Sequence, residues 1–283
     1  MEIAVLLIEC PDQPGIVAKV SDCIFRHGGN IVNLDQYTTD PYGGRFFTRI
    51  EFGFDGAAVE RAELEAAMGE LAASLDAQWA MHYRDHRLRM GVLVSKYDHC
   101  LVELLYRQRS RELPVDIPCV ISNHPDLQPL AEQHGVPFIH IPFTAETHAE
   151  SEQKVLEQVK DSTDFLVLAR FMRILSEDFL ETYGKDIINI HHSFLPSFKG
   201  ADPYRQAYNR GVKVIGATAH FATADLDEGP IIDQVVERVS HKDNIADLKR
   251  KGRMLEKQAL ANAVFAYIEH RIIRFANKTV VFT

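Results

Sequence analysis

The feature that most limits the fold is an alternation of short apolar runs and helical patterns that begins at Met90. Short buried strands separated by helices are typical of a parallel sheet with helices on both faces. Side chains that act on a ligand then gather at the carboxyl ends of the strands. We expect a doubly wound, mostly parallel, Rossmann-like α/β domain. Its predicted strands are 90–95, 117–122, 137–141, 165–169 and 187–190, and its predicted helices are 100–107, 127–134, 146–159 and 176–183.

The residues before this alternation follow a different plan. Predicted strands and helices occur in the order βαββαβ, which is the ferredoxin-like arrangement. The segment 84–89, RDHRLR, is charged and has no apolar periodicity, so it predicts a linker. A chain of 283 residues is long enough for two domains. We expect one domain at 1–84 and the second at 85–283. The predicted N-terminal elements are strands 3–8, 31–39, 45–54 and 77–83 and helices 16–24 and 59–74.

Charge and composition exclude several functions. The net charge is −9, of which −7 falls on residues 1–84, so the N-terminal domain is not expected to bind nucleic acid. No apolar run approaches the roughly 20 residues that a membrane span needs. The N-terminus has no basic segment or cleavage motif of a signal peptide, and the four cysteines form no CxxC pair. These features predict a cytoplasmic protein with reduced cysteines and no membrane partner.

The chemistry-bearing residues cluster between positions 187 and 234. Asn189 and His191 close a predicted strand. His220 lies at the end of the next predicted strand, 212–221, and Asp227 follows it. An amide, imidazoles and a carboxylate suit a carbonyl substrate, because they can stabilise an oxyanion, donate a proton and orient a base. Strand alternation predicts that Asn189 and His191 share one face. It predicts that His192 faces away from His191, a poor chelating geometry, so we expect no metal.

The N-terminal segment CPDQPGIVAKVSDCIFRHGGNIVNLDQ resembles an ACT domain. The resemblance implies side-by-side pairing, and therefore a homo-oligomer. It also implies a small effector, often an amino acid, near Asp12, Gly15 and Asn30. A purely structural alternative remains open, in which Asp12 caps the first helix and the prolines and glycine shape its turn.

The second domain resembles the folate-dependent formyltransferases. The resemblance rests on Asn189-Ile190-His191, Lys199-Gly200, Gly216-Ala217-Thr218-Ala219-His220, Leu226-Asp227-Glu228-Gly229-Pro230 and the segment ARFMRIL at 169–175. It implies that Asn189, His191 and Asp227 act on the formyl group of 10-formyltetrahydrofolate, the substrate, with no tightly bound cofactor. The residues implied to bind the folate are Met172, Arg173, Ile174, Leu175, His220, Thr223 and Gly229. The role of His220 stays open between contact with Asp227 or folate and structural support.

The acceptor of the formyl group decides between transfer and hydrolysis. The transferases hold a phosphate with a glycine-rich loop after the first strand, whereas residues 95–100, SKYDHC, contain no glycine and place Asp98 there. With His192-Ser193-Phe194 and the ACT-like domain, the chain resembles the formyltetrahydrofolate deformylases over nearly its full length. That implies hydrolysis by water, which supplies formate for purine synthesis and balances one-carbon folate pools. The alternatives are a phosphoribosylglycinamide formyltransferase and a non-catalytic folate or amino-acid sensor.

Overall fold

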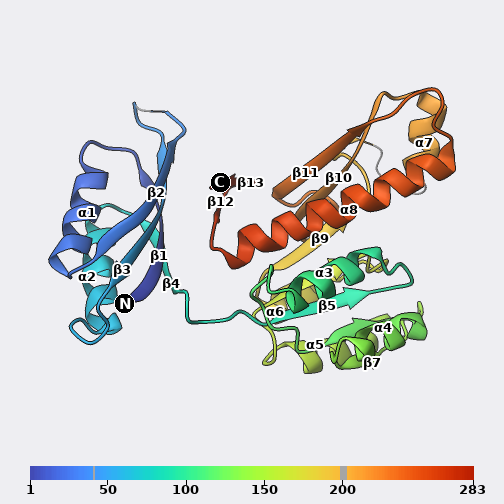
Figure 1. Cartoon of the computed structure of the whole chain (residues 1–283), viewed down its shortest axis with the longest axis horizontal. Helices are drawn as coiled ribbons and strands as arrows, with labels where there is room; N and C mark the ends of the chain where they lie inside the picture. The colour runs from blue at the N-terminus through green and yellow to red at the C-terminus, as the bar shows by residue number, and fades with distance from the viewer. Residues whose placement is uncertain (41, 198–202) are drawn as a thin grey trace. The chain divides into compact units, whose positions relative to one another are not determined.

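The computed structural model describes residues 1–40, 42–197 and 203–283. Lys199 and Gly200, which contributed to the resemblance, lie outside these ranges. The chain divides into two compact units, shown in Figure 1. The first comprises Met1–Arg87, Glu269–Phe275 and Val280–Thr283, and the second comprises Leu88–Ile268 and Ala276–Thr279. Across the described ranges, no helix combines the length and the apolar character that crossing a membrane requires.

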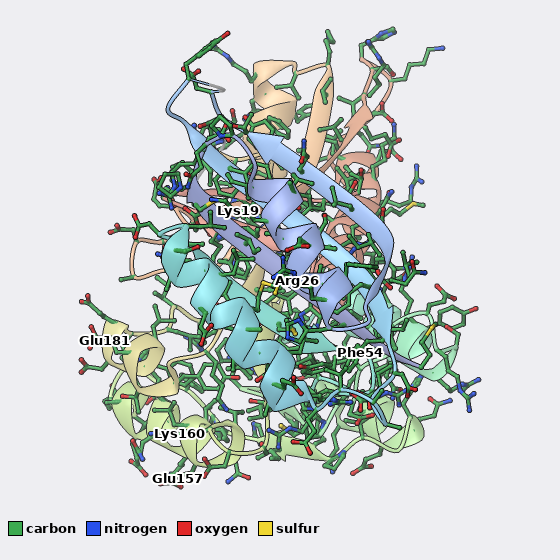
Figure 2. The ribbon with its side chains drawn as sticks, turned by 90° about the vertical axis from the view of Figure 1, so that its left-hand side faces the viewer. Lys19, Arg26, Phe54, Glu157, Lys160 and Glu181 are labelled. Atoms are coloured by element: carbon green, nitrogen blue, oxygen red, sulfur yellow. The ribbon has the colours of Figure 1, made fainter. Side chains whose placement is uncertain are left out.

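The first unit has the predicted βαββαβ order, which confirms the ferredoxin-like expectation. Its antiparallel sheet has the strand order β2-β3-β1-β4. The helices α1 and α2 lie side by side over one face of this sheet, and Lys19 and Arg26 lie on the exposed side of α1 (Figure 2). The elements are β1 (Glu2–Pro11), α1 (Ile16–Arg26), β2 (Asn30–Thr38), β3 (Arg45–Phe54), α2 (Arg61–Ser74) and β4 (Gln78–Tyr83).

Both faces of this sheet are covered. Leu6 and Ile8 of β1 pack under the helices with Val20 and Met68. Because side chains alternate along a strand, Leu7 and Phe47 point to the opposite face. There they pack against Ile273, Phe282 and the partly buried Phe275 and Val280.

The C-terminal strands β12 (Ile272–Phe275) and β13 (Lys278–Val281) form a two-stranded sheet, and most of this segment belongs to the first unit. Arg49, which is buried, donates from Nε to the carbonyl of His270 at 3.1 Å and from Nη2 to that of Glu269 at 3.1 Å. The expected division into 1–84 and 85–283 differs here, because the contacts of Glu269–Phe275 and Val280–Thr283 are with the first unit.

A stacked histidine pair joins this C-terminal segment to β4. The rings of His82 and His270 are parallel, with centroids 3.7 Å apart. Burial, followed by the neighbouring His82, lowers the pKa of His270 to about 3, and burial also lowers the pKa of His82. Both groups therefore stabilise the fold in their neutral form. This contribution is complete above the ordinary histidine pKa of about 6.5 and is lost as the pH falls below it.

We therefore expect the free energy of unfolding to fall as the pH is lowered from 7 to 4.5. The fall should be about 1–2 kcal/mol larger in the parent protein than in His82→Phe. Phenylalanine keeps an aromatic ring in the stack and removes one titrating group. Chemical denaturation at both pH values measures the difference. Parallel pH dependences for the two proteins would contradict this account of the pair.

The second unit contains a seven-stranded sheet in the order β11-β10-β9-β8-β5-β6-β7. The five strands from β9 to β7 are parallel, and β10 is antiparallel to both of its neighbours, β9 and β11. This confirms the mostly parallel α/β expectation. The strands are β5 (Met90–Val94), β6 (Val120–Ser122), β7 (Phe138–His140), β8 (Phe165–Ala169), β9 (Ile187–His191), β10 (Val214–Phe221) and β11 (Ile231–Arg238).

Helices cover both faces of this sheet. Val155 and Phe179, from α5 and α6, pack with Leu93 and Leu168 in one buried cluster. The long helix α8 packs against β9, β10, β11 and α3. The helices are α3 (His99–Arg109), α4 (Gln128–Gln133, preceded by a 3₁₀ turn), α5 (His148–Val159), α6 (Glu177–Tyr183), α7 (Pro203–Arg210) and α8 (Ile245–Ile268).

The strand order reverses direction between β5 and β8. From β5 the chain proceeds to β6 and β7 on one side and then returns to β8 and β9 on the other. Ligands bind outside the carboxyl ends of the strands at such a switch point. Ser95, Arg170 and His191 stand at these ends, after β5, after β8 and at the end of β9.

Candidate active site

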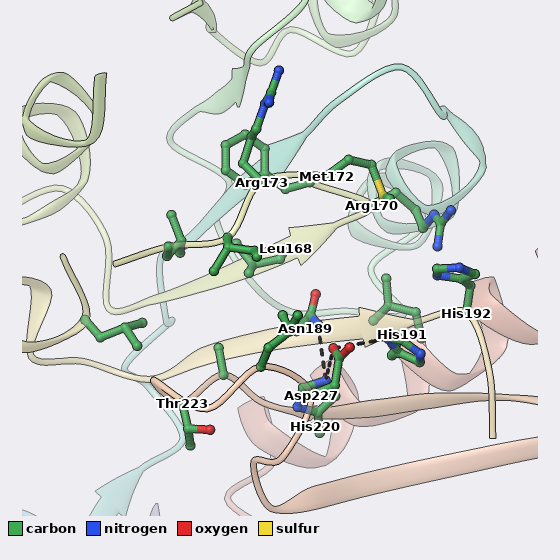
Figure 3. A pocket seen from close by; sticks show the side chains of 17 residues that line it. Leu168, Arg170, Met172, Arg173, Asn189, His191, His192, His220, Thr223 and Asp227 are labelled. Carbon is green, nitrogen blue, oxygen red and sulfur yellow. Dashed lines mark hydrogen bonds and ion pairs between the residues drawn. The ribbon is translucent and has the colours of Figure 1, made fainter. Parts of the chain in front are cut away.

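A crevice of about 340 Å³ lies beside the ends of β8 and β9 and the loop that follows β10 (Figure 3). It is apolar along one part and carries polar groups at the other, as ligand sites commonly do. The lining residues are Leu168, Arg170, Phe171, Met172, Arg173, Ile174, Leu175, Leu180, Asn189, Ile190, His191, His192, His220, Ala222, Thr223, Leu226 and Asp227.

Asn189 is oriented by a hydrogen bond with His220. The antiparallel register places His220 of β10 opposite Asn189 of β9. His220 Nδ1 lies 2.9 Å from the carbonyl oxygen of Phe221, which only accepts, so Nδ1 carries a proton. His220 Nε2 then accepts from Asn189 Nδ2 at 3.1 Å. An amide nitrogen has two protons, so the second N–H of Asn189 remains available to a ligand.

His191 is held by a carboxylate at one ring nitrogen. Its Nδ1 donates to Asp227 Oδ1 at 3.1 Å, and this bond fixes the proton on Nδ1. The other nitrogen, Nε2, is buried and has no hydrogen-bond partner among the described residues. A buried imidazole nitrogen without a partner is unusual in a folded protein. A ligand in this crevice could supply the missing partner.

Asp227 is held as an anion between two histidines. It also lies 3.7 Å from His220 Nε2. Burial on its own would raise the pKa of Asp227, but the hydrogen bond from His191 outweighs burial and holds this pKa well below its ordinary value. Its backbone has φ of 58°, a left-handed conformation that Asp and Asn tolerate better than most residues. The carboxylate therefore stays ionised and orients the imidazole of His191.

Most of the predicted folate residues line the crevice. Met172–Leu175, His220 and Thr223 are among the lining residues, and the side chains of Met172 and Ile174 are exposed. The backbone N–H of Met172 donates to Ser95 Oγ at 3.0 Å, which fixes the start of this loop. Gly229 is not a lining residue. A Cβ there would lie 1.8 Å from the carbonyl oxygen of Phe221, so this glycine serves the close return of the loop to β10.

The prediction that His192 points away from His191 is wrong. The two rings are stacked, with centroids 5.0 Å apart, and both line the crevice. The physical reason is that β9 ends at His191, so the alternation of a strand no longer governs the next residue. Burial, followed by the charge of Arg170, lowers the pKa of His192 to about 4, and this histidine is neutral at physiological pH.

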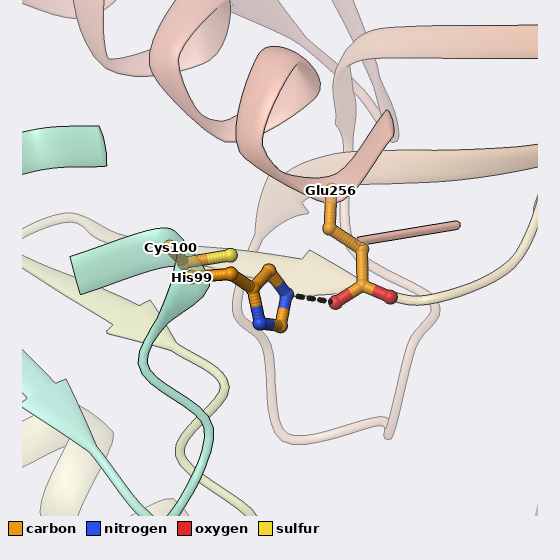
Figure 4. Close-up of side chains that lie close together, drawn as sticks. All are labelled: His99, Cys100 and Glu256. Atoms are coloured by element: carbon orange, nitrogen blue, oxygen red, sulfur yellow. Dashed lines mark hydrogen bonds and ion pairs between the residues drawn. The ribbon is translucent and has the colours of Figure 1, made fainter. Parts of the chain in front are cut away.

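Sequence patterns did not predict Arg170 or the buried cluster beside it, which consists of His99, Tyr204 and Glu256. His99 Nε2 donates to Glu256 Oε2 at 2.7 Å, and Tyr204 donates to Glu256 Oε1 at 2.7 Å (Figure 4). Arg170 Nε lies 3.3 Å from Glu256 Oε2. The only sequence signals were the place of Arg170 after a strand and the His99-Cys100 pair. Glu256 lies in a distant helix with nothing local to mark it.

The same group offers three candidate metal ligands. One atom each of His99, Cys100 and Glu256 lies within 4.8 Å of the others. However, burial raises the pKa of the Cys100 thiol well above its usual value, so the thiol stays protonated. Arg170 stands beside the carboxylate, and its positive charge opposes a cation. Glu256 is thus the centre of a network of hydrogen bonds and ion pairs with His99, Tyr204 and Arg170.

The three positions proposed for an effector differ in their surroundings. Asp12 accepts from Thr38 Oγ1 at 2.7 Å and forms no side-chain cap on α1. Gly15 is the N-cap residue, with φ of 88°. The alternative that Asp12 caps this helix is therefore wrong. Asn30 begins β2 and is exposed.

Comparisons with known proteins identify both units. A formyl transferase family model matches residues 88–264, and an ACT domain model matches residues 4–67. A formyltetrahydrofolate deformylase from Synechocystis is 50% identical over 280 residues, which cover 99% of this chain and 98% of that protein. The formyltetrahydrofolate deformylase from Bacillus subtilis is 48% identical, over 98% of this chain and 93% of that protein.

Solved structures of a deformylase and of a transformylase both match this chain, and the deformylase matches better. The crystal structure of a formyltetrahydrofolate deformylase from Burkholderia mallei matches with a TM-score of 0.92 and 44% identity, over 100% of both chains. Glycinamide ribonucleotide transformylase 1 from Symbiobacterium toebii matches with a TM-score of 0.67 and 30% identity. It covers 71% of this chain and 97% of its own. The transformylase is thus the more distant relative.

Proposed function

This chain belongs to the family of formyltetrahydrofolate deformylases, and from that premise we propose that Asn189, His191 and Asp227 perform the chemistry. The reaction is the hydrolysis of 10-formyltetrahydrofolate to formate and tetrahydrofolate. The observation that carries the proposal is the pair formed by His191 and Asp227, 3.1 Å apart, with His191 Nε2 unpartnered among the described residues in the crevice.

His191 acts as the general base in this proposal. Its Nδ1–H is engaged by Asp227, so the lone pair of Nε2 faces the crevice and takes a proton from the attacking water. The imidazolium that forms is stabilised by the adjacent carboxylate, whose lowered pKa keeps it charged. Asp227 therefore stabilises the charge that develops on His191 during attack.

Asn189 stabilises the oxyanion. As water adds to the formyl carbon, the carbonyl oxygen gains negative charge and needs a donor already in place. The free N–H of Asn189 provides it, since the other N–H is committed to His220. Because His220 is fixed by Phe221, the amide needs little reorganisation during the reaction.

The proton that His191 takes from water ends on N10 of the substrate. The tetrahedral intermediate collapses, the bond from carbon to N10 breaks, and His191 returns its proton to that nitrogen. The products are tetrahydrofolate and formic acid, which loses its proton to solvent as formate. No group other than water is consumed.

The loop after β5 favours water over an amine acceptor. In this chain the Ser95 hydroxyl donates to Asn123 Oδ1 at 2.6 Å and accepts from Met172, so it is used internally. Asp98 is the N-cap residue of α3, so a negatively charged residue stands at the helix N-terminus, where an anion would otherwise bind. This carboxylate would repel the phosphate of a phosphorylated amine acceptor.

A single comparison tests hydrolysis. The purified protein is incubated with 10-formyltetrahydrofolate, with and without glycinamide ribonucleotide, while formate and tetrahydrofolate are measured. We expect equal amounts of both products and no effect of the ribonucleotide. Tetrahydrofolate formation that depends on the ribonucleotide, without formate, would show a transferase.

The wider setting is also part of the proposal. We place the protein in the cytoplasm, which its four free cysteines support. There the formate would serve purine synthesis and the reaction would balance folate pools. The ACT unit would pair with a second copy and bind a small amino acid near Asp12, Gly15 and Asn30. The exposed edge strand β2 supports pairing.

A further inference from the structure

A second cavity adjoins the catalytic end of the crevice. It has a volume of about 310 Å³ and shares Arg170, Met172 and His192 with the crevice. His192 is stacked on His191, so this cavity opens next to the reacting atoms. Its other lining residues are Tyr97, His99, Pro203, Tyr204, Lys249, Arg253 and Glu256.

The charge of this cavity is positive. Arg170, Lys249 and Arg253 contribute three permanent cations. The one carboxylate, Glu256, is already engaged by His99, Tyr204 and Arg170. Burial would raise its pKa, but the contact with His99 and the charge of Arg170 outweigh burial and lower it, so Glu256 stays ionised and compensated.

His99 Nδ1 is buried and has no hydrogen-bond partner among the residues that the structure describes. Arg170 Nε lies 3.3 Å from Glu256 Oε2 as an ion pair, but it too lacks a hydrogen bond there. The Arg170 residue is 9% exposed, and the His99 side chain is 10% exposed. Figure 3 shows the guanidinium of Arg170 beside the ring of His192, and Figure 4 shows His99 turned toward Glu256. Buried polar atoms of this kind normally have partners, so the site is built for a polar ligand.

We propose that this second cavity binds formate and is its exit route. The inference rests on the proposed function, since hydrolysis releases formate beside His191 while the folate still fills the apolar part of the crevice. A small carboxylate matches guanidinium donors in geometry and charge. The cation at the junction, Arg170, takes the product from the crevice, and Lys249 and Arg253 draw it toward solvent.

Binding is tested without turnover. The line width of ¹³C-formate is measured in the presence of the folate-free full chain, at constant ionic strength. We expect broadening with the parent protein and at least a fivefold weaker affinity in the double variant Lys249→Met/Arg253→Met. The matched control is Arg250→Met, which removes a cation of the same helix that does not line the cavity and should leave the affinity unchanged.

Product inhibition gives the second readout. Sodium formate should inhibit deformylation by the parent protein, and the inhibition constant should rise at least fivefold in the double variant. Unchanged formate affinity in the double variant, an equal loss in Arg250→Met, or binding of inorganic phosphate but not formate would each overturn the inference. Because formate binding is measured without substrate, a protein that hydrolyses 10-formyltetrahydrofolate but does not bind formate refutes only this inference. One that binds formate without hydrolysis refutes the proposed function.

Discussion

Replacing Asp227 with asparagine should lower the rate of formate release by about 10³–10⁴-fold, as loss of the carboxylate does in related imidazole–carboxylate pairs. Asparagine keeps the shape of the side chain and tolerates the left-handed backbone at this position, where φ is 58°. The imidazolium of His191 then loses its negative partner. The measurement is kcat from steady-state release of tetrahydrofolate.

The control for this experiment is Asp225→Asn. Asp225 lies in the same loop and is exposed, and it does not line the crevice. This control should retain the parent rate, and both variants should remain folded at the assay temperature. A rate for Asp227→Asn within tenfold of the parent would remove Asp227 from the proposed mechanism.

Replacing Asn189 with alanine should lower kcat by about 10²–10³-fold with a small change in KM, because an oxyanion donor acts mainly in the transition state. The substitution also leaves His220 Nε2 without its donor. Loss of that partner should cost about 1–3 kcal/mol of stability, so the assay is made well below the unfolding temperature.

The matched control is Asn209→Ala, which truncates an exposed asparagine of α7. It should behave as the parent protein. An Asn189→Ala variant that raises KM with an unchanged kcat would assign Asn189 to substrate binding rather than to the oxyanion.

Local patterns were sufficient to predict most of the fold. The βαββαβ order and the later strand–helix alternation follow from apolar periodicity and turn residues, and the structure confirms both. The return of the C-terminal strands was not predicted. Adjacent apolar residues such as Phe46 and Phe47 mark a strand that is buried on both faces, but they do not identify what covers the second face.

The site was predictable where it depended on strand geometry. Asn189 and His191 line the same crevice because alternating residues of a strand share a face. His192 was mispredicted because the strand ends one residue earlier. The contact of Glu256 with His99 joins helices far apart in the chain, and only the packing of α8 against α3 brings them together. Such a contact leaves no periodic signal.

In the proposed mechanism, water attacks the formyl carbon within this crevice. The most direct measurement is a single turnover of 10-formyltetrahydrofolate in H₂¹⁸O, with the formate analysed by mass spectrometry. We expect one solvent oxygen in each formate, formed at the same rate as tetrahydrofolate, and a loss of both products in Asp227→Asn. Tetrahydrofolate that appears without labelled formate would contradict this mechanism.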